Sequence, residues 1–373
     1  MFEVLGFSRR AALPVALALA AAALGVSAAG ASASSAAGEV YTLTNSPAGN
    51  AVKAFDRAGD GSLAPAGQFA TGGTGTGGGL GNQGAMVIER GLLFAVNPGS
   101  DSISSFRIRP DRLELIDTDP SGGDQPISLT ADDGLLYVLN AGGAGNITGL
   151  VVSENGALSP LAGSTRPLSG AGPGPAQVSF DPDGEQLVVS EKDTNLIDTY
   201  EIDDDSGLAS GPNPQPSAGQ TPFGFGFDKR GHLIVSEAFG GAPDASAVSS
   251  YRLENGLIDP ITPSAPTTET AACWIAVTKD GRFTYTTNTG SASISGYRIG
   301  HQGELSALDP DGQTGVTGPG PIDMALSRNS RYLYSLNSGD GTLSGFRVGA
   351  RGDLTPIGGA AGLPLSASGL AAR

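Results

Sequence analysis

The sequence predicts an all-β protein: a seven-bladed β-propeller with four-stranded antiparallel blades, whose ring is closed by the C-terminal strand pairing with the first blade. Two observations support this prediction. Short apolar runs, each ending in a small polar residue, recur at intervals of 43 to 52 residues, which is the spacing of propeller blades. The 58 glycines and 25 prolines gather between these runs, as turn residues do in all-β proteins. The seven runs end at Asn45, Asn97, Asn140, Ser190, Ser236, Asn288 and Asn337.

Residues 1–37 differ in composition from the rest of the chain and are predicted to be a signal peptide. Ser8-Arg9-Arg10 precedes an apolar stretch from Ala11 to Ala29, and small residues follow, in the charged, apolar, small order of a secretory signal. The segment from Ser8 to Leu13 also resembles a twin-arginine export signal, the alternative being two ordinary cations of a secretory signal. We therefore expect a secreted, extracytoplasmic protein without stable membrane insertion after processing, in which residues 38–373 form a single propeller domain.

The charge balance excludes one class of partner. The chain carries 37 acidic residues against 21 Lys and Arg, for a net charge of −16. Nucleic acid binding requires clustered cations that displace counterions from the phosphates, and no such cluster stands in the sequence. We interpret the acidity as a source of solubility outside the cell. A single cysteine, Cys273, rules out an intramolecular disulfide.

Each repeat contains the same four elements in order. A first apolar run, often opened by a proline, leads into a turn such as Asp181-Pro182-Asp183-Gly184, where glycine supplies the positive φ of a hairpin. The anchor run follows as the second strand. An alternating segment such as Ile294–Ile299 forms the third strand, with one face packed and one face toward solvent. A Gly-x-Leu triplet such as Gly303-Glu304-Leu305 opens the fourth.

The first blade lacks its innermost strand, because the mature chain starts directly at the strand around Val40. Residues 367–372 look like that missing strand and are predicted to close the ring, which removes exposed sheet edges. The glycine-rich stretch from Thr71 to Gly81 joins blades one and two. We interpret it as a flexible crossover loop rather than a phosphate-binding loop, because neither Gly-Lys-Ser/Thr nor a helix follows it.

The repeated pattern of proline, Asp-x-Gly turn, Tyr-Val-x-Asn run, alternating strand and Gly-x-Leu, with Tyr137–Asn140 and Ile103–Ile108 as examples, resembles the lactonase-type seven-bladed propellers. That group includes bacterial 6-phosphogluconolactonase and fungal 3-carboxymuconate lactonising enzyme. The resemblance covers residues 39–373, and Tyr137–Asn140 is also similar to the Tyr-Val-Thr-Asn repeats of surface-layer propellers. It implies that a lactone is opened or closed by residues lying where the innermost strands enter the central channel.

The chain departs from several residues that the resemblance implies. Pro175-Ala176 stands where the family shows Pro-His in the fourth blade, Pro222-Phe223-Gly224 where it shows Pro-Arg-His in the fifth, and Leu196 at an expected arginine. The acidic residue after the second strand of the fifth blade is present as Glu237, and Glu191 is its counterpart in the fourth. Because two carboxylates in different environments can divide acid and base roles, Glu237 and Glu191 are the candidate catalytic residues. The alternative is that both are solvated loop acids.

The other residues suited to lactone chemistry are few. Histidine has an unperturbed pKa in the range that general acid–base catalysis needs, but the two histidines, His232 and His301, are predicted in hairpin turns of the fifth and sixth blades. Cys273 has no histidine or other base beside it in the sequence, so we do not expect it to be a nucleophile.

A ligand site is predicted at the mouth of the channel. Trp274, the only tryptophan, stands in the sixth blade where Ala176 stands in the fourth, and it is expected near Phe223. Aromatic surface with polar neighbours such as Gln177 and Gln83 suits a small-molecule pocket. The alternative is that Trp274 fills space between blades.

Asparagines end the second strand of four blades, at Asn97, Asn140, Asn288 and Asn337. Asn and Glu oxygens can surround a divalent metal. Their repetition in most blades instead favours a structural role, in which each amide bonds backbone groups of a turn. No cluster of His and Cys suggests zinc, so we predict no metal and no cofactor.

Two functions of different class remain open. The first is an exported lactonase-like enzyme that hydrolyses or isomerises a lactone or sugar-acid substrate through Glu237 and Glu191. The second is a non-catalytic secreted propeller that binds a small molecule, a carbohydrate or a protein at the channel mouth. The missing family histidine favours the second on chemical grounds, whereas the resemblance along the whole chain favours the first. The sequence leaves the oligomeric state and the identity of the ligand open.

Overall fold

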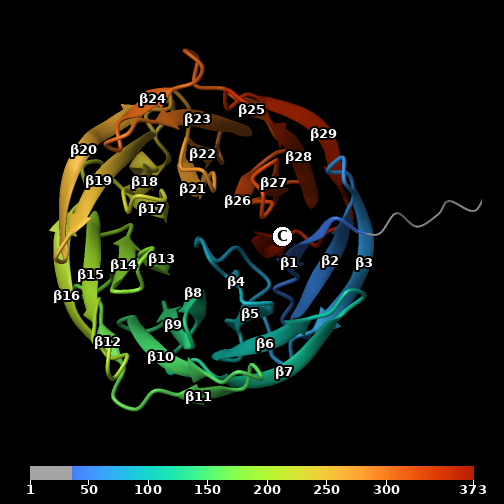
Figure 1. Ribbon diagram of the computed structural model, residues 1–373, viewed down its shortest axis with the longest axis vertical. Coiled ribbons are helices and arrows are strands. Elements are labelled where there is room, and N and C mark those ends of the chain that lie inside the picture. The colour runs from blue at the N-terminus through green and yellow to red at the C-terminus, as the bar shows by residue number, and fades with distance from the viewer. Residues whose placement is uncertain (1–35) are drawn as a thin grey trace, which may run out of the picture. The chain divides into compact units, whose positions relative to one another are not determined.

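The computed structural model describes residues 36–373, which form a ring of seven β-sheets around a central channel (Figure 1). Each sheet is a blade of four antiparallel strands, and two of the blades carry a short fifth strand. The predicted seven-bladed propeller is therefore confirmed. Apart from the 3₁₀ turn η1 (Phe239–Gly241), the described residues contain only strands, turns and loops. The predicted signal peptide lies outside the described residues, except for its last two positions.

Blades 2 to 4 run along the chain from the innermost strand outward, and blade 1 takes its innermost strand from the other end of the chain. Blade 1 contains β30 (Ser368–Ala372), β1 (Gly38–Leu43), β2 (Ala51–Arg57) and β3 (Leu63–Ala70). Blade 2 contains β4 (Met86–Glu89), β5 (Leu92–Asn97), β6 (Ser102–Ile108) and β7 (Leu113–Pro120). Blade 3 contains β8 (Pro126–Asp132), β9 (Leu135–Asn140), β10 (Asn146–Val152), β11 (Leu158–Pro160) and β12 (Arg166–Pro167). Blade 4 contains β13 (Pro175–Phe180), β14 (Gln186–Glu191), β15 (Leu196–Ile202) and β16 (Ala209–Pro216).

Blades 5 to 7 repeat this order and complete the ring. Blade 5 contains β17 (Pro222–Phe227), β18 (Leu233–Glu237), β19 (Ala247–Glu254) and β20 (Leu257–Pro266). Blade 6 contains β21 (Ala272–Val277), β22 (Phe283–Asn288), β23 (Ser293–Ile299), β24 (Leu305–Ala307) and β25 (Gly315–Val316). Blade 7 contains β26 (Pro321–Leu326), β27 (Tyr332–Asn337), β28 (Thr342–Val348) and β29 (Leu354–Ala360).

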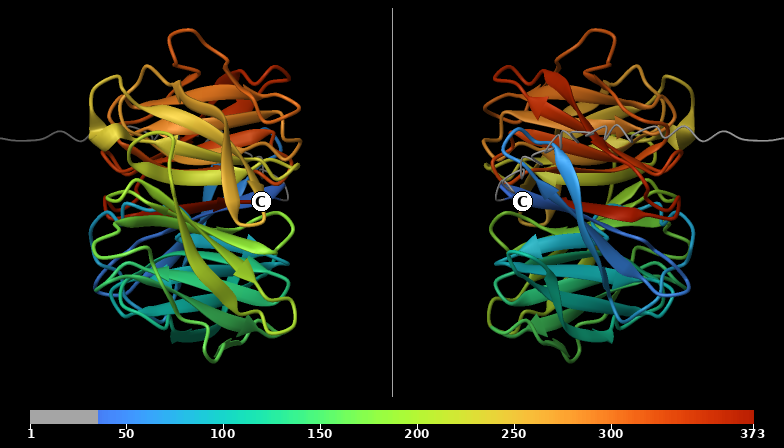
Figure 2. Two further views of the ribbon diagram at one scale, coloured as in Figure 1. Left: turned by 90° about the vertical axis from the view of Figure 1, so that its left-hand side faces the viewer. Right: turned by 90° about the vertical axis from the view of Figure 1, so that its right-hand side faces the viewer.

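The ring is closed by strand pairing between the two ends of the propeller, as the sequence predicted. β30 lies antiparallel beside β1, with Val40 opposite Ala372 and Thr42 opposite Leu370. The red C-terminal strand therefore lies inside the blue first blade, and the blades form a disc when seen from the side (Figures 1 and 2). β1 therefore has a partner on both sides, and β30 covers the inner edge that β1 would otherwise expose.

Tyrosines of the second strands tie blades 6 and 7 each to the next blade of the ring. The hydroxyl of Tyr285 in blade 6 donates to the carbonyl oxygen of Gly352 in blade 7, at 2.8 Å, and Tyr334 in blade 7 donates to Gly61 in blade 1, at 2.7 Å. Both acceptors are glycines of the Gly-x-Leu triplets. Gly61 has a φ of +92°, and a Cβ there would lie 2.4 Å from the ring of Tyr332. The triplet glycine therefore permits both the turn and the close packing of blades.

The apolar core lies between the faces of adjacent blades rather than in one central mass. The largest fully buried side chains are aromatic, and they include Tyr137, Tyr200, Tyr251, Tyr285, Tyr297 and Tyr334. In the part of the chain that the structure covers, no helix has the length and hydropathy of a membrane span.

Candidate functional site

The middle of the ring is occupied by residues 80–85, which we call the channel segment. It follows the glycine-rich stretch and reaches into the channel before β4 begins (Figure 1). Its backbone bonds the innermost strands of two blades: Gln83 N donates to Ala176 O at 3.0 Å, and Leu129 N donates to Gly84 O at 2.9 Å. Gly84 has a φ of +82°, and a Cβ there would lie 2.8 Å from Ser128 Oγ, so the close approach requires glycine.

The predicted aromatic site lies under the channel segment. Phe223 on β17 and Trp274 on β21 meet with their ring centroids 4.9 Å apart and are only 7% and 4% exposed. The indole N–H of Trp274 donates to Asn82 O at 2.7 Å. The ammonium of Lys192 lies 5.0 Å from the Phe223 ring centroid and donates to Gly81 O. Burial lowers the pKa of Lys192. The structure therefore brings the two aromatic residues together as predicted, but it covers them.

The two glutamines of the predicted site bond backbone groups. The side-chain amide of Gln83 donates to Ile275 O at 2.7 Å and its oxygen accepts from Ile275 N at 2.9 Å. Gln177 does the same to blade 5, donating to Phe225 O at 3.1 Å and accepting from Phe225 N at 2.7 Å. Each amide thus replaces a stretch of strand pairing and is held against the inner strand of the facing blade.

Glu237 lies at the end of β18, and its carboxylate is fully buried. One oxygen accepts from Gly219 N at 2.8 Å and from Ser249 Oγ at 2.5 Å, and the other accepts from Ser264 Oγ at 2.7 Å. These donors come from the loop before blade 5 and from the outer strands of the same blade. The carboxylate therefore joins the loop before blade 5 to the two outer strands of that blade. Its predicted catalytic role stays a prediction, and these contacts favour a structural one.

Glu191 occupies the equivalent position at the end of β14 and is also fully buried. It accepts from Ser169 N at 3.0 Å and from Thr194 Oγ1 at 2.6 Å. A second buried carboxyl, that of Asp198 on β15, lies beside that of Glu191. Burial, together with the neighbouring Glu191 carboxyl, raises the pKa of Asp198 to about 8. The pair holds a proton at neutral pH, but its buried position separates it from solvent.

The amides of the strand-end asparagines Asn288 and Asn337 donate to side-chain hydroxyls of the third strand, and not to the turn backbone groups that the sequence suggested. The Asn288 amide donates to Ser293 Oγ and Ser295 Oγ at 3.0 and 2.9 Å, and Asn337 donates to Thr342 Oγ1 and Ser344 Oγ at 2.9 Å each. Glu191 and Glu237 hold the same position in blades 4 and 5. Among the residues that the structure describes, no group of three or more His, Cys, Asp or Glu side chains is arranged to hold a metal ion.

Cys273 and His232 are both held by their surroundings. Cys273 is 7% exposed, and burial raises the pKa of its thiol to about 12, so it is protonated at neutral pH.

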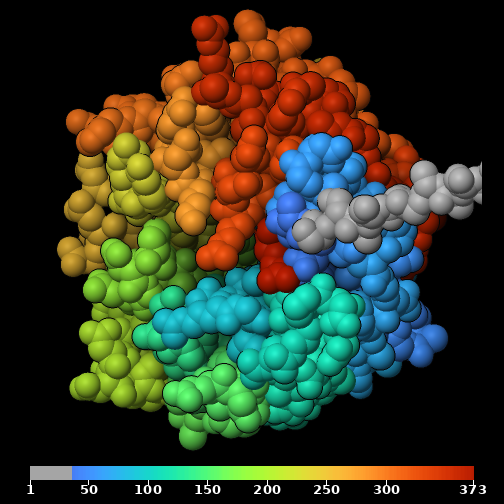
Figure 3. Space-filling view, turned by 45° about the vertical axis from the view of Figure 1, so that its right-hand side comes forward, coloured from blue at the N-terminus to red at the C-terminus, as the bar shows by residue number. Residues whose placement is uncertain are grey.

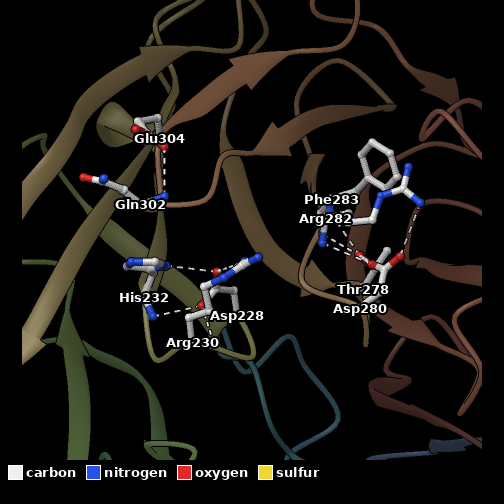
Figure 4. A network of polar contacts seen from close by, with 9 residues as sticks. All are labelled: Asp228, Arg230, His232, Thr278, Asp280, Arg282, Phe283, Gln302 and Glu304. Atoms are coloured by element: carbon white, nitrogen blue, oxygen red, sulfur yellow. Dashed lines mark hydrogen bonds and ion pairs between the residues drawn. The ribbon is translucent and has the colours of Figure 1, made fainter.

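The imidazole Nδ1 of His232 contacts Asp228 Oδ2 at 3.0 Å in the turn between β17 and β18 (Figure 4). Burial alone would raise the pKa of Asp228, but the hydrogen bonds from His232 and from backbone N–H groups outweigh it and lower the pKa. His301 is exposed in the turn between β23 and β24.

A cavity that the sequence did not predict lies at the ring closure. It has a volume of about 630 Å³ and is called the seam cavity here; its lining residues are Ala36, Ala37, Gly38, Glu39, Arg57, Lys279, Arg328, Asn329 and Arg373. Figure 3 shows the red C-terminal residues in a recess beside the blue first blade and the orange-red seventh blade. Four of the lining residues are cationic and one is acidic, in a chain whose net charge is −16.

Two of the four cations are already bonded. Arg57 donates to Ala37 O at 2.7 Å and to the main-chain oxygen of Arg373 at 3.1 Å. The guanidinium of Arg373 is paired with the carboxylate of Glu39. Lys279 and Arg328 are exposed, and neither side chain forms an ion pair or a hydrogen bond within residues 36–373. The seam cavity therefore presents two unpaired positive charges, which suits an anionic ligand.

Sequence reasoning missed the seam cavity because its residues are far apart along the chain. Lys279 and Arg328 are the second residues of equivalent turns, β21–β22 and β26–β27, and Arg57 ends β2. The signal was present in the repeat: these turns read Thr-Lys-Asp-Gly and Ser-Arg-Asn-Ser, whereas the equivalent turn of blade 4 reads Asp-Pro-Asp-Gly. Alignment of the turns would have shown cations in adjacent blades.

The comparisons with known proteins agree with this fold. The chain resembles a candidate 6-phosphogluconolactonase of Bacteroides fragilis, with 20% identity over 90% of this chain and 98% of that one and a TM-score of 0.72. It resembles the periplasmic gluconolactonase PpgL of Pseudomonas aeruginosa, with 18% identity over 88% and 98% of the two chains and a TM-score of 0.63. No curated protein matches the chain. The family model described as "Lactonase, 7-bladed beta-propeller" matches residues 81–365. The chain therefore belongs to the lactonase family of seven-bladed β-propellers.

Proposed function

We propose that this propeller opens the ring of a sugar-acid lactone outside the cytoplasm, and that the reaction takes place in the seam cavity. The observation that carries the proposal is the pair of unpaired cations, Lys279 and Arg328, in a cavity that also contains the carboxylate of Glu39. Membership of the lactonase family supports the reaction class. Support for export comes from Ser8-Arg9-Arg10 and the apolar stretch that follows it.

The chemistry requires a base and a source of positive charge. Water attacks the lactone carbonyl, negative charge develops on the carbonyl oxygen, and the ring C–O bond breaks to give a carboxylate and a hydroxyl. Lys279 and Arg328 stabilise the oxyanion and then the carboxylate product. Glu39 is the acidic residue that lines this cavity. Its carboxylate takes a proton from the attacking water and then gives that proton to the ring oxygen as the C–O bond breaks. The ion pair with Arg373 orients the Glu39 carboxylate.

The test is turnover by the purified protein of aldonolactones, sugar-acid lactones and muconolactones, followed by proton release. Glu39→Gln is expected to lower kcat by about 10²-fold or more, and Lys279→Gln to raise KM for anionic lactones. Lys229→Gln is a matched control, because Lys229 holds the same turn position in blade 5 and does not line the seam cavity. Loss of turnover in Glu237→Gln at unchanged thermal stability, with full activity in Glu39→Gln, would place the reaction at Glu237 and overturn the seam-cavity assignment.

A second candidate function is binding without catalysis, of a small molecule, a carbohydrate or a protein. The observation that favours it is the burial of Glu191 and Glu237, whose oxygens are bonded within their own blades. An absence of turnover on every lactone, together with saturable binding of a sugar acid, would favour this candidate.

A further inference from the structure

A second cavity adjoins the seam cavity and continues it between blades 6 and 7. It has a volume of about 370 Å³ and shares Lys279 and Asn329 with the seam cavity. Arg282 and Arg331 also line it. Arg331 is exposed, and its guanidinium forms no ion pair or hydrogen bond with any of residues 36–373. Together the two cavities form what we call the cationic groove.

The turns that carry these cations are fixed by hydrogen bonds. In the β21–β22 turn, Asp280 Oδ1 accepts from Thr278 Oγ1 at 2.7 Å and from Arg282 N at 3.1 Å (Figure 4). In the β26–β27 turn, Asn329 Oδ1 accepts from Ser327 Oγ at 3.0 Å and from Arg331 N at 3.1 Å. The same arrangement in two blades holds the backbone of Lys279 and Arg331 in place.

The two turns are also bonded to each other. Lys279 N donates to Ser330 Oγ at 2.8 Å, so the turns of blades 6 and 7 form one platform. Arg282 closes the far side of the groove by donating to Ala350 O at 2.8 Å, and its guanidinium lies 4.9 Å from the ring centroid of Phe283 (Figure 4). The unpaired charges of Lys279, Arg328 and Arg331 therefore follow one another along a preformed surface.

The corresponding turns of blades 3 and 4 carry the opposite charge. The inner turns of blades 3 and 4 contain Asp133 and Asp183, and a cavity of about 530 Å³ beside them is lined by six aspartates: Asp132, Asp133, Asp183, Asp203, Asp204 and Asp205. A mainly acidic protein thus carries cations on these turns in blades 5, 6 and 7, at Lys229, Lys279 and Arg328, and those of blades 6 and 7 line the cationic groove. The cationic groove therefore attracts an anionic ligand by charge complementarity, and the aspartate-lined cavity at blades 3 and 4 repels one.

We propose that the cationic groove binds a linear anionic carbohydrate of at least two charged sugar residues, one held by Lys279 and Arg328 and the next by Arg331. The two adjoining cavities share Lys279, and each contains a further unpaired cation, which suits a chain of charged sugars that places one charge in each cavity. This inference deepens the proposed function and rests on it for the lactone in the seam cavity: the substrate is the terminal lactone of an acidic oligosaccharide.

The test is calorimetric titration of the full protein with galacturonate, trigalacturonate and the neutral sugar cellotriose, at low and high salt. Trigalacturonate is expected to bind at least about tenfold more tightly than galacturonate, because a second charge-assisted contact forms. High salt should weaken this binding, and cellotriose should not bind. Arg331→Gln should reduce the ratio of the two affinities toward one, and Lys229→Gln should leave it unchanged. Circular dichroism and the thermal midpoint confirm that each variant is folded.

Equal affinities for galacturonate and trigalacturonate, or an unchanged ratio in Arg331→Gln, would overturn the inference. So would tighter binding to phosphatidylglycerol vesicles than to trigalacturonate. The two proposals fail separately: hydrolysis of a monomeric lactone without preference for the trimer leaves only the proposed function standing. Binding of trigalacturonate without turnover of any lactone leaves the groove as a carbohydrate-binding site.

Discussion

The guanidinium of Arg373 donates to both carboxylate oxygens of Glu39, with Nη2 and Oε1 2.8 Å apart. The side chain of Glu39 is 10% exposed and that of Arg373 is 37% exposed, so the ion pair is partly shielded from water. It joins β1 to the residue that follows β30. The strand pairing that closes the ring is thus reinforced by charge at its outer end.

We predict that Arg373→Gln destabilises the protein by about 1 kcal/mol, because a partly exposed pair contributes little beyond its hydrogen bonds. The measurement is urea unfolding at low and at high salt, where the difference from the unsubstituted protein should shrink with salt. Arg351→Gln, on the exposed turn between β28 and β29, is the control. Equal stability of Arg373→Gln and the control would show that strand pairing alone closes the ring.

Removal of β30 is expected to have a much larger effect. Deletion from Leu363 onward takes away the innermost strand of blade 1 and exposes the inner edge of β1 along Val40 to Leu43. Leu370, which is 6% exposed and packs in the core between blades 7 and 1, is lost as well. We predict loss of the cooperative thermal transition, measured by calorimetry. An unchanged transition in the truncated chain would contradict closure by this strand.

The buried aspartates make stability depend on pH. Burial raises the pKa of Asp198 and of Asp323 to about 8 from 3.8. Below pH 4 both groups are protonated in the folded and the unfolded chain, so their full contribution is present. As pH rises from about 4 to about 8 the unfolded chain loses these protons and the folded one keeps them, and each group costs about 1.4 kcal/mol per pH unit.

We predict that Asp198→Ser removes one group's share of this slope. Serine is the matched replacement, because it stands at the equivalent position in blades 2, 5, 6 and 7. In blade 5 this serine is Ser249, which donates to Glu237. Unfolding free energy should be measured by urea titration across pH 4 to 8, and the variant should lose less stability than the unsubstituted protein as pH rises. Parallel curves would mean that Asp198 is ionised in the folded chain.

The channel segment provides a further prediction. Gln83→Ala removes both side-chain bonds to Ile275 and leaves the buried N–H and carbonyl of Ile275 unpaired. We expect this to lower the free energy of unfolding by about 1–3 kcal/mol. Trp274 should become more accessible, which acrylamide quenching of its fluorescence measures. Gln302→Ala, at an exposed turn position, is the control. Unchanged quenching would show that Asn82 and its neighbours hold the segment without Gln83.

The fold could be predicted from the sequence because its signals are local and repeated. Each hairpin is indicated by local features: an apolar run such as the one ending at Asn97 or Asn288, a turn glycine and a Gly-x-Leu triplet. Seven copies of these features indicate the ring. The last strand was also predictable, since Ser368–Ala372 fills the one vacancy in the repeat.

The site was only partly predictable, because it depends on contacts between distant segments. The inner-strand position of Phe223 follows from the repeat register, because Phe223 aligns with Ala176. The register expected for Trp274 was wrong by one residue, since Cys273 aligns with Ala176 and Trp274 with Gln177. That Asn82 and Gln83 would cover the two aromatic side chains does not follow, since residues 80–85 belong to no strand. Nor does the sequence show that Glu237 collects its donors from Gly219 and Ser264, which lie 18 and 27 residues away.

The channel segment also adds a cross-connection to the ring. In a propeller whose blades touch only their neighbours, loosening of one blade is felt by the two beside it. Here residues 82–84 bond the inner strands of blades 3, 4 and 6, at Leu129, Ala176 and Ile275. Loosening of any one of these inner strands is therefore transmitted across the ring as well as around it.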